Sequence, residues 1–291
     1  MTVITDDYCN MKYFTAFVFI ITLMVTSLLK AEETIELHDA HIHYDKDMWR
    51  SLPAAEAIDM LKHLNIQRVL VSSTPTEGAE KLYRQAPDMV IPMLRPYDSW
   101  RHRYFWHKDP ALKSYLLSHL KKTPYRGIGE FHVFGKHTDS LQIEQMIDIA
   151  RQYRLPLHAH TDLEGMQILL KKAQDLDVIW AHGGGDVDEK YLEQFLIQYP
   201  GFYIELSLRE HMLDSDEKLT TQWRYLLTQY SQRFLLGSDT YKPRRWSELE
   251  ETVSETRHWL SQLPENIIAD IARNNLKRLF PKNSAAKLAH Q

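Results

Sequence analysis

Cysteine is nearly absent from this sequence of 291 residues, because Cys9 is the only one. Cys9 precedes a long apolar run at residues 14–29, and it is lost with that run if the run is cleaved as a signal peptide. The remaining chain then has no thiol and can form no disulfide and no thiolate metal site. Any metal ion must be held by nitrogen and oxygen donors. A chain without cysteine also suits an oxidising compartment.

Apart from residues 14–29 the sequence has no long apolar run. This run follows Lys12 and is followed by Lys30 and Ala31, which is the pattern of a secretory signal peptide. It is shorter than the ~20 residues of a membrane-spanning helix. We therefore expect a signal peptide at residues 1–31 and a periplasmic or secreted protein without a stable membrane partner. An uncleaved N-terminal membrane anchor is the alternative. Met11 fits the pattern of a start better than Met1, which makes the first ten residues an extension.

The sequence also lacks a strong charge excess, internal repeats, low-complexity tracts and Pro/Gly-rich linkers. Its formal net charge is -4, and this balance does not favour nucleic acid as a partner. Without a linker, residues 32–281 are expected to form one domain, followed by a polar tail at residues 282–291. The length fits the ~250 residues typical of an eight-fold α/β barrel.

Short β-rich runs alternate with amphipathic helical stretches along the chain. Several of the runs are almost wholly apolar, as parallel strands covered by helices are. Eight such units favour a (β/α)8 TIM barrel over an open doubly wound sheet. The expected strands are residues 34–38, 68–73, 89–94, 127–131, 155–160, 177–182, 202–207 and 234–237.

The helical stretches show a clear period. Ile143, Met146, Ile147 and Ala150 fall at i, i+3, i+4 and i+7, which gives one apolar stripe to pack against a sheet. The same spacing recurs at Leu192, Phe195, Leu196 and Tyr199. The last expected helix covers residues 265–280 and stops at Pro281.

Histidines and carboxylates gather at the carboxyl ends of the expected strands. His41 and His43 stand at i and i+2, so one strand end can present both imidazoles to a single cation. In a TIM barrel the carboxyl ends of the strands converge on one rim, where catalytic residues lie. His, Asp and Glu are also ligands of zinc and similar divalent ions. The other candidates at these ends are Glu130, His158, His160, His182 and Asp239.

Several of these residues also have a purely structural interpretation. Glu130 could pair with Arg95, because a buried carboxylate needs a cation or several donors. His158 could fill the barrel interior as a core histidine, and Asp239 could cap the following segment. The run 183–185, Gly-Gly-Gly, favours a turn that leaves the rim.

Five motifs follow one another in chain order: H-x-H at 41–43, G-I-G-E at 127–130, L-P-L-H-A-H-T-D at 155–162, W-A-H-G-G-G at 180–185 and L-G-S-D-T at 236–240. This ordered set resembles the amidohydrolase superfamily, and within it the amidohydrolase-related branch and the TatD-like metal-dependent hydrolases. The resemblance covers the whole chain after the expected signal peptide. It implies a TIM barrel with one or two divalent metal ions, zinc being the first choice.

The resemblance also implies roles for individual residues. His41 and His43 would be metal ligands, and Asp239 would be both a ligand and the proton acceptor. The spacing from the strand 5 proline matches His160 to the ligand of the family, with His158 as the second choice.

The sequence departs from the family pattern on strand 4. Members that bridge two metal ions often use a carboxylated lysine there, and this sequence has none; Glu130 resembles the bridging glutamate of the TatD-like group. If Glu130 bridges two ions, His182 is implied as a ligand of the second. If it does not, His182 is implied to act on the substrate.

A connection rich in aromatic and cationic side chains follows strand 3, at residues 95–108. It could cover the metal and bind an anionic or ring-bearing substrate, or it could be an ordinary solvated loop. Arg95 and Arg209 are the candidates for a carboxylate or phosphate clamp, because a guanidinium binds such groups bidentately.

These observations predict a metal-dependent hydrolase that uses a metal-activated water on a small anionic amide, ester, lactone or phosphoester. Asp239 and His182 are its expected catalytic residues, and a homo-oligomer is compatible with the sequence. One alternative keeps the fold and metal but decarboxylates an unsaturated or aromatic acid. The other is a barrel without turnover that only binds a ligand.

Overall fold

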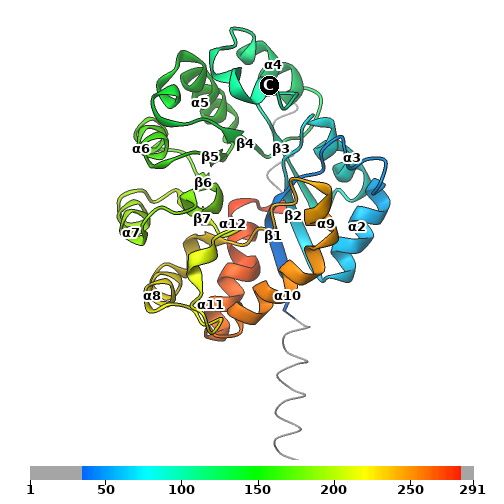
Figure 1. Ribbon diagram of the computed structural model, residues 1–291. Coiled ribbons are helices and arrows are strands. Elements are labelled where there is room, and N and C mark those ends of the chain that lie inside the picture. The colour runs from blue at the N-terminus through cyan, green and yellow to red at the C-terminus, as the bar shows by residue number, and fades with distance from the viewer. Residues whose placement is uncertain (1–34, 283–291) are drawn as a thin grey trace, which may run out of the picture. The chain divides into compact units, whose positions relative to one another are not determined.

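The computed structural model describes residues 35–282, apart from the side chain of Glu210. Its centre is a sheet of eight parallel strands in the order β1-β2-β3-β4-β5-β6-β7-β8, each paired with the next (Figure 1). The strands are β1 Leu37–Ile42, β2 Ile66–Val71, β3 Val90–Leu94, β4 Gly127–His132, β5 Leu157–His160, β6 Val178–Trp180, β7 Phe202–Glu205 and β8 Phe234–Leu235. The eight expected strands are confirmed, whereas the expected signal peptide lies outside the described residues.

Backbone hydrogen bonds connect the two ends of the sheet. The amide of Ala40 donates to the carbonyl of Leu236 at 2.7 Å, and the amide of Asp239 donates to the carbonyl of His41 at 2.7 Å. The strands therefore form a nearly closed barrel, consistent with a TIM barrel. The second bond also places Asp239 beside β1, although Asp239 and β1 are far apart in the sequence.

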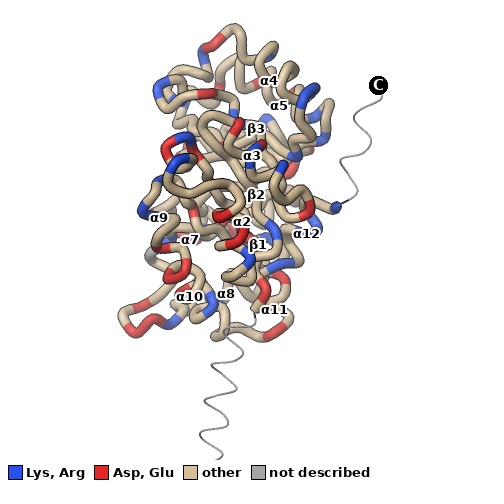
Figure 2. The backbone as a smooth tube through the Cα atoms, turned by 90° about the vertical axis from the view of Figure 1, so that its right-hand side faces the viewer, with Lys and Arg blue, Asp and Glu red and all other residues tan. Residues whose placement is uncertain are grey.

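Helices surround the strands (Figure 1). They are α2 Ala54–His63, α3 Glu77–Gln85, α4 Leu112–Leu120, α5 Leu141–Tyr153, α6 Leu163–Lys172, α7 Glu189–Gln198, α8 Thr221–Gln229, α9 Pro243–Ser247, α10 Leu249–Leu260, α11 Glu265–Ala269 and α12 Asn275–Leu279. Within residues 35–282, none of the helices has the length and apolar character that a membrane span requires. Basic and acidic residues are interspersed along the side shown in Figure 2.

The helix α5 shows why these stretches are helical. Ile143, Met146, Ile147 and Ala150 are all buried, as the sequence period predicts. Ser140 caps the helix, because its side chain accepts a hydrogen bond from the amide of Ile143 at 3.3 Å. The apolar stripe thus packs inward while the cap satisfies one of the first free amides.

Three element boundaries differ from the prediction. Strand 1 was expected at residues 34–38 but covers Leu37–Ile42. The prediction was wrong because the polar residues Asp39 and His41 fell beyond the expected strand, whereas both are buried within β1. Strand 6 ends at Trp180, because the backbone turns into the short 3-10 helix η4, Ala181–Gly184. The expected helix at 265–280 is divided by a π-helical turn, Asp270–Asn274.

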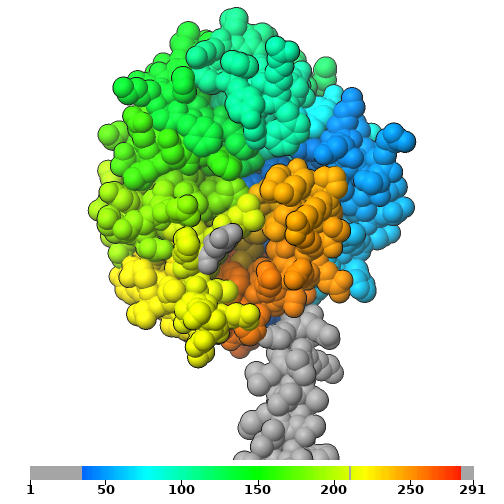
Figure 3. Space-filling view, viewed as in Figure 1, coloured from blue at the N-terminus to red at the C-terminus, as the bar shows by residue number. Residues whose placement is uncertain are grey.

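An apolar cluster fills the barrel away from the ionisable residues. It joins strand residues to the end of the chain's last helix, and its members are Ala40, Leu70, Ile91, Met93, Ile179, Leu235, Leu276 and Phe280. Arg68 in β2 donates from Nη2 to the carbonyl of Phe280 at 2.7 Å. The segment after β8 is thereby tied back to the sheet. In Figure 3 the orange part of the chain, which includes α10, lies on the same face as the yellow part, which includes α8. Arg224 of α8 donates from Nη1 to the carbonyl of Gln262, just after α10, at 2.7 Å.

Asn275 is fully buried and holds the short β8 in place. Its Nδ2 donates to the carbonyls of Ser231 and Phe234, both at 2.7 Å. We expect Asn275→Ala to lower the free energy of unfolding by about 2 to 4 kcal/mol, because two buried carbonyls lose their donor at about 1–3 kcal/mol each. Urea denaturation measures this change. The exposed Asn266→Ala is the matched control, and an equal loss in both variants would contradict the role of Asn275.

Candidate metal centre

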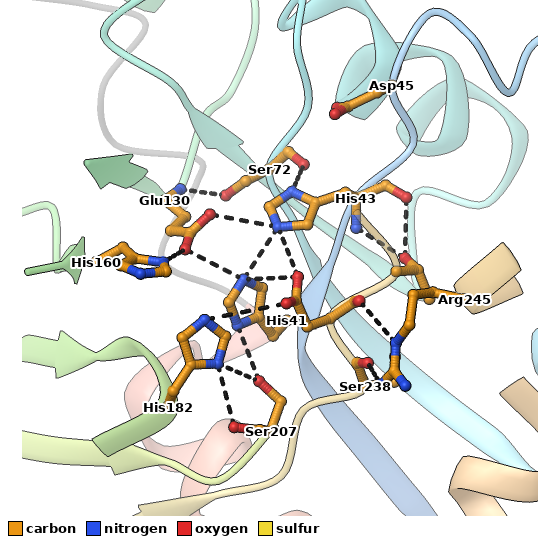
Figure 4. A network of polar contacts seen from close by, with 12 residues as sticks. His41, His43, Asp45, Ser72, Glu130, His160, His182, Ser207, Ser238 and Arg245 are labelled. Atoms are coloured by element: carbon orange, nitrogen blue, oxygen red, sulfur yellow. Dashed lines mark hydrogen bonds and ion pairs between the residues drawn. The ribbon is translucent and has the colours of Figure 1, made fainter. Parts of the chain in front are cut away.

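Imidazoles and carboxylates from five parts of the barrel meet at the carboxyl ends of its strands (Figure 4). His41 lies in β1 and His43 one residue beyond it, Glu130 lies in β4, and His160 ends β5. His182 lies in η4 and Asp239 follows β8. All except His160 are at least nine-tenths buried. The structure therefore brings together every residue that the sequence singled out as a metal ligand.

Three donor atoms lie at the mutual spacing of metal ligands. His41 Nε2 and His43 Nε2 are 3.0 Å apart, and Asp239 Oδ1 is 3.5 Å from the first and 3.1 Å from the second. Donors about 2.0–2.1 Å from a tetrahedral zinc ion are about 3.3 Å from one another. Glu130 adds a second carboxylate and a fourth donor residue, with its Oε2 3.3 Å from His43 Nε2.

In three of the imidazoles the second ring nitrogen, Nδ1, is hydrogen-bonded to an oxygen atom of the protein. His41 Nδ1 lies 2.7 Å from Glu205 Oε2, and His43 Nδ1 lies 2.7 Å from the carbonyl of Ser72. His182 Nδ1 lies 3.1 Å from the carbonyl of Ser207. Because carbonyl and carboxylate oxygens only accept, Nδ1 carries the proton in each ring. The lone pairs of Nε2 then face the centre, as in histidines that bind a metal.

A second group of donors shares Glu130 with the first. Glu130, His160 and His182 offer ligand atoms within 4.8 Å of one another, as do His41, His43 and Glu130. Glu130 Oε1 lies 2.8 Å from His160 Nδ1. The carboxylate of Glu130 thus stands between the two groups, which is the position of a bridging ligand.

The close approach of opposite charges shifts the pKa values of these groups. Burial alone would lower the pKa of His41, but Glu205, Asp239 and Glu130 raise it well above its usual value. Burial raises the pKa of Glu205, yet His41 beside it brings the net value down to about 2. Burial also raises the pKa of Glu130, and His132 and His41 hold it well below its usual range. The carboxylates are therefore ionised, and without an ion in the site His41 holds a second proton, which a bound cation would displace.

The donor set fits a divalent cation. Two Nε2 lone pairs and two carboxylates face one another at 3.0 to 3.6 Å. Protons on the imidazoles, or a metal ion in their place, offset the negative charge of the two carboxylates. His41, His43, Asp239 and Glu130 can hold one ion, and His160 and His182 with Glu130 offer the donors for another.

Two of these residues have strained backbones. His182 has φ 58° and Asp239 has φ 49°, in the left-handed region that residues with a Cβ rarely adopt. A residue in this region costs roughly 1–3 kcal/mol of conformational free energy, and the conformation persists only where the surrounding structure holds it. The bond from the amide of Asp239 to the carbonyl of His41 supplies that restraint for Asp239.

His158 lies deeper than the donor set. It is 1% exposed, its ring centroid is 4.8 Å from that of His41, and neither ring nitrogen has a hydrogen-bond partner. Burial lowers the pKa of His158 to about 3, helped by the nearby charge of His41. The choice of His160 over His158 as the ligand on strand 5 remains a prediction.

The two arginines expected to bind substrate are engaged by the protein. Arg95 is fully buried, and its Nη2 lies 2.7 Å from Glu130 Oε2. This is the ion pair that the structural interpretation of Glu130 anticipated, and the same carboxylate also contacts the imidazoles. Arg209 donates from Nη1 to the carbonyl of Gly183 at 2.9 Å and from Nη2 to that of Val187 at 2.6 Å. It holds the loop after η4, and its role toward substrate remains a prediction.

Several residues of the centre were not singled out from the sequence, among them Ser207, which fixes His182. Glu205 is fully buried at the end of β7 and orients His41. Ser72 supplies the carbonyl that orients His43. His132 stacks on His160 with ring centroids 4.4 Å apart. Only Glu205 could have been noticed in the sequence, because it is a charged residue within the otherwise uncharged run 202–206.

The donors open into a pocket of about 500 Å3. His43, Glu130, His160, His182 and Asp239 are part of its lining. This volume lies in the range of small-molecule sites, roughly 300–1,000 Å3.

With this geometry established, known proteins provide a comparison. No protein-family model matches the chain, and no curated protein matches it in sequence. Solved structures do match. An amidohydrolase from Burkholderia multivorans with bound zinc is 13% identical, with 84% of this chain and 98% of that chain covered and a TM-score of 0.54.

A probable 2-pyrone-4,6-dicarboxylic acid hydrolase from Acinetobacter baumannii, with citric acid bound, is 14% identical over 84% of this chain and 99% of that chain, with a TM-score of 0.58. A 2,6-dihydroxybenzoate decarboxylase is 13% identical over 84% of this chain and 98% of that chain, with a TM-score of 0.55. This chain shares their fold. At such low identity the likeness extends to the barrel and not to substrates.

The neutral state of buried His158 predicts a pH dependence of stability. Its pKa is about 3 in the folded chain and about 6.5 in the unfolded chain, so between these values only the unfolded chain binds this proton. As pH falls from 6.5 towards 3, folded stability decreases, by about 1.4 kcal/mol per pH unit for one proton.

As pH falls from 6.5 towards 3, we expect the free energy of unfolding of His158→Gln to decrease less steeply than that of wild type. The difference in slope is about 1.4 kcal/mol per pH unit, the value for one proton. Urea denaturation at a series of pH values, with a chelator present, measures the difference. His63→Gln, at an exposed histidine, should leave the slope unchanged. An unaltered slope in His158→Gln would show that His158 is protonated in the folded chain.

Proposed function

We propose that this protein is a metal-dependent hydrolase of the amidohydrolase superfamily that acts on a small anionic substrate. One observation carries the proposal. Three imidazoles have Nδ1 fixed by outer acceptors, and the Nε2 atoms of two of them face carboxylates at the spacing of metal ligands. An apolar or merely structural barrel core would have no reason to concentrate so many acceptors.

Zinc is the metal we propose, because the donors are imidazole nitrogens and carboxylate oxygens without sulfur. The first ion would be held by His41, His43, Asp239 and Glu130. A second ion would use Glu130, His160 and His182. When bound, such a cation supplies Lewis acidity that lowers the pKa of water to about 7 and polarises a carbonyl or phosphoryl oxygen.

Asp239 is placed to move the proton. Its Oδ1 faces His41 and His43, and its Oδ2 lies 4.0 Å from His182 Nε2 at the pocket wall. Burial raises the pKa of Asp239, but His41 and His43 lower it below its usual range, so the carboxylate is ionised at neutral pH. It can orient the attacking water, accept its proton and deliver that proton to the leaving group.

His182 is placed to act on the substrate oxygen. Its Nδ1 is bound by Ser207, and the ring lines the pocket. Burial lowers the pKa of His182, aided by the nearby charge of His41, so the ring is neutral at neutral pH. A fixed neutral imidazole at this position can bind the second ion or stabilise charge on the reacting group.

We also propose that the protein is exported, with residues 1–31 as its signal peptide. The apolar run at residues 14–29 and the lack of cysteine after it support this proposal.

Replacement of Asp239 tests the mechanism. We expect Asp239→Asn to lower kcat per bound zinc by about 10²- to 10⁴-fold, because the amide cannot accept the proton. The zinc-loaded protein is assayed on p-nitrophenyl acetate, dihydrocoumarin, p-nitroacetanilide and bis(p-nitrophenyl) phosphate. Asp148→Asn, at an exposed aspartate of α5, is the control.

Product analysis separates the alternatives. In water enriched in oxygen-18 a hydrolase incorporates the label into its product. Carbon dioxide released from aromatic acids without incorporation would instead support a decarboxylase. A zinc-loaded wild type that turns over none of these compounds, with ligand affinity unaffected by Asp239→Asn, would indicate a barrel that only binds.

A further inference from the structure

A second pocket adjoins the metal centre. It also has a volume of about 500 Å3 and shares Arg103, His132, Phe134 and His160 with the pocket above the donors. We call it the side pocket; the segment 103–108 and the segment 132–137 after β4 contribute its walls. A molecule with one group at the metal centre can therefore extend into the side pocket without leaving the protein.

The side pocket is cationic and aromatic. Arg103, Lys108 and His107 line it, together with the rings of Tyr104, Phe105 and Phe134. Among the described residues no carboxylate belongs to its lining. The pocket above the donors differs, because Glu130, Asp162 and Asp239 line that one. The chemistry of the side pocket thus favours an anionic group carried on a planar or apolar skeleton.

Arg103 stands where the two pockets meet, and its charge is not neutralised. Its Nη2 donates to the Tyr104 hydroxyl at 2.7 Å, and its guanidinium lies over the rings of Trp100 and Tyr104 at 4.6 and 4.8 Å. No carboxylate in residues 35–282 forms an ion pair with it. Stacking on two rings fixes the plane of the guanidinium and leaves other N–H groups for a ligand.

The other arginines of the region are already committed. Arg95 is bound to Glu130, and Arg209 is bound to backbone carbonyls and forms an ion pair with Glu189 at 3.5 Å. Neither therefore has the unsatisfied charge that carboxylate recognition needs. Of the three, Arg103 is the one that lines a pocket and lacks an acidic partner.

A buried histidine inside the side pocket has an unused ring nitrogen. His107 is 7% exposed, and its Nε2 has no hydrogen-bond partner. Its ring centroid lies 4.6 Å from that of His137. A buried polar atom without a partner is costly unless a ligand or water satisfies it. His107 is thus a buried part of the pocket wall whose replacement alters the side pocket.

We propose that the side pocket is a subsite for a second acidic group of the substrate, which Arg103 binds while the reacting group lies at the metal centre. The substrate class is then an acid with two separated acidic groups on a planar skeleton. This rests on the proposed function only in assigning the reacting group to the metal centre. Phe105 and Phe134 contact the skeleton, and the ring of His107 forms part of the wall beside it.

Direct binding tests the subsite. Isothermal titration of the zinc-loaded full chain compares isophthalate and terephthalate with their monoamides, 3- and 4-carbamoylbenzoate. Each pair has one shape and differs by one charge. We expect at least one dicarboxylate to bind about 10-fold or more tightly than its monoamide, the difference that a charged hydrogen-bonded pair makes.

Variants locate the preference. Arg103→Met should abolish the preference for the dicarboxylate without changing the affinity for the monoamide. Arg103→Lys should retain part of that preference. His107→Phe, which alters the side pocket but not the pocket above the donors, should reduce it several-fold. Arg101→Met, at an exposed arginine of the same loop, is the matched control and should keep it. Zinc content and melting temperature show that each variant is folded and loaded.

The outcomes separate this inference from the proposed function. Wild type without a dicarboxylate preference, or a preference that survives Arg103→Met, overturns the subsite. A preference that survives His107→Phe unchanged places the acid outside the side pocket and also overturns it. Turnover of the ester and lactone panel is measured in parallel. Its absence, with an Arg103-dependent preference, contradicts the hydrolase and leaves the subsite standing.

Discussion

The rest of the site depends on the hydrogen bonds that fix Nδ1 of His41, His43 and His182. The acceptors are the Glu205 carboxylate of β7, the carbonyl of Ser207 two residues after it, and the carbonyl of Ser72 just after β2. Because these oxygens cannot donate, each ring presents an Nε2 lone pair to the centre. Rings free to rotate or to change tautomer would bind a cation weakly and orient no substrate.

The barrel supplies what these bonds need. Parallel strands bring the outer acceptors and the imidazoles to one end, although His41 and Glu205 are 164 residues apart. The apolar cluster, which includes Leu276 and Phe280 from the end of the described chain, stabilises the barrel by burying apolar side chains. Excess negative charge is thus confined to the rim, where Arg95 balances part of it and a cation can balance the rest.

Much of this could be predicted from the sequence, for identifiable reasons. His41 and His43 were found because the period of a strand places i and i+2 on one face. Glu130, His182 and Asp239 were found because each follows or ends an apolar run. Eight such runs alternating with helices also predicted the barrel.

What escaped prediction depends on contacts between distant segments. Glu205 looks like any carboxylate until the register places it against His41. The end of β1 was placed too early because burial of Asp39 and His41 inside a strand contradicts the usual position of ionisable side chains. Which arginine is free for substrate depends on neighbours: Arg95 and Arg209 are bound by the protein, whereas Arg103 is not paired with a carboxylate in residues 35–282.

The central claim is that the fixed imidazoles and their carboxylates hold a cation. Zinc content per chain, measured after loading and exhaustive dialysis, tests it most directly, in wild type and in His41→Gln with His43→Gln. The account predicts at least one tightly held ion in wild type and none at this position in the double variant, with the fold intact by circular dichroism. A wild type that retains no zinc, or a double variant that retains the same amount, would contradict it.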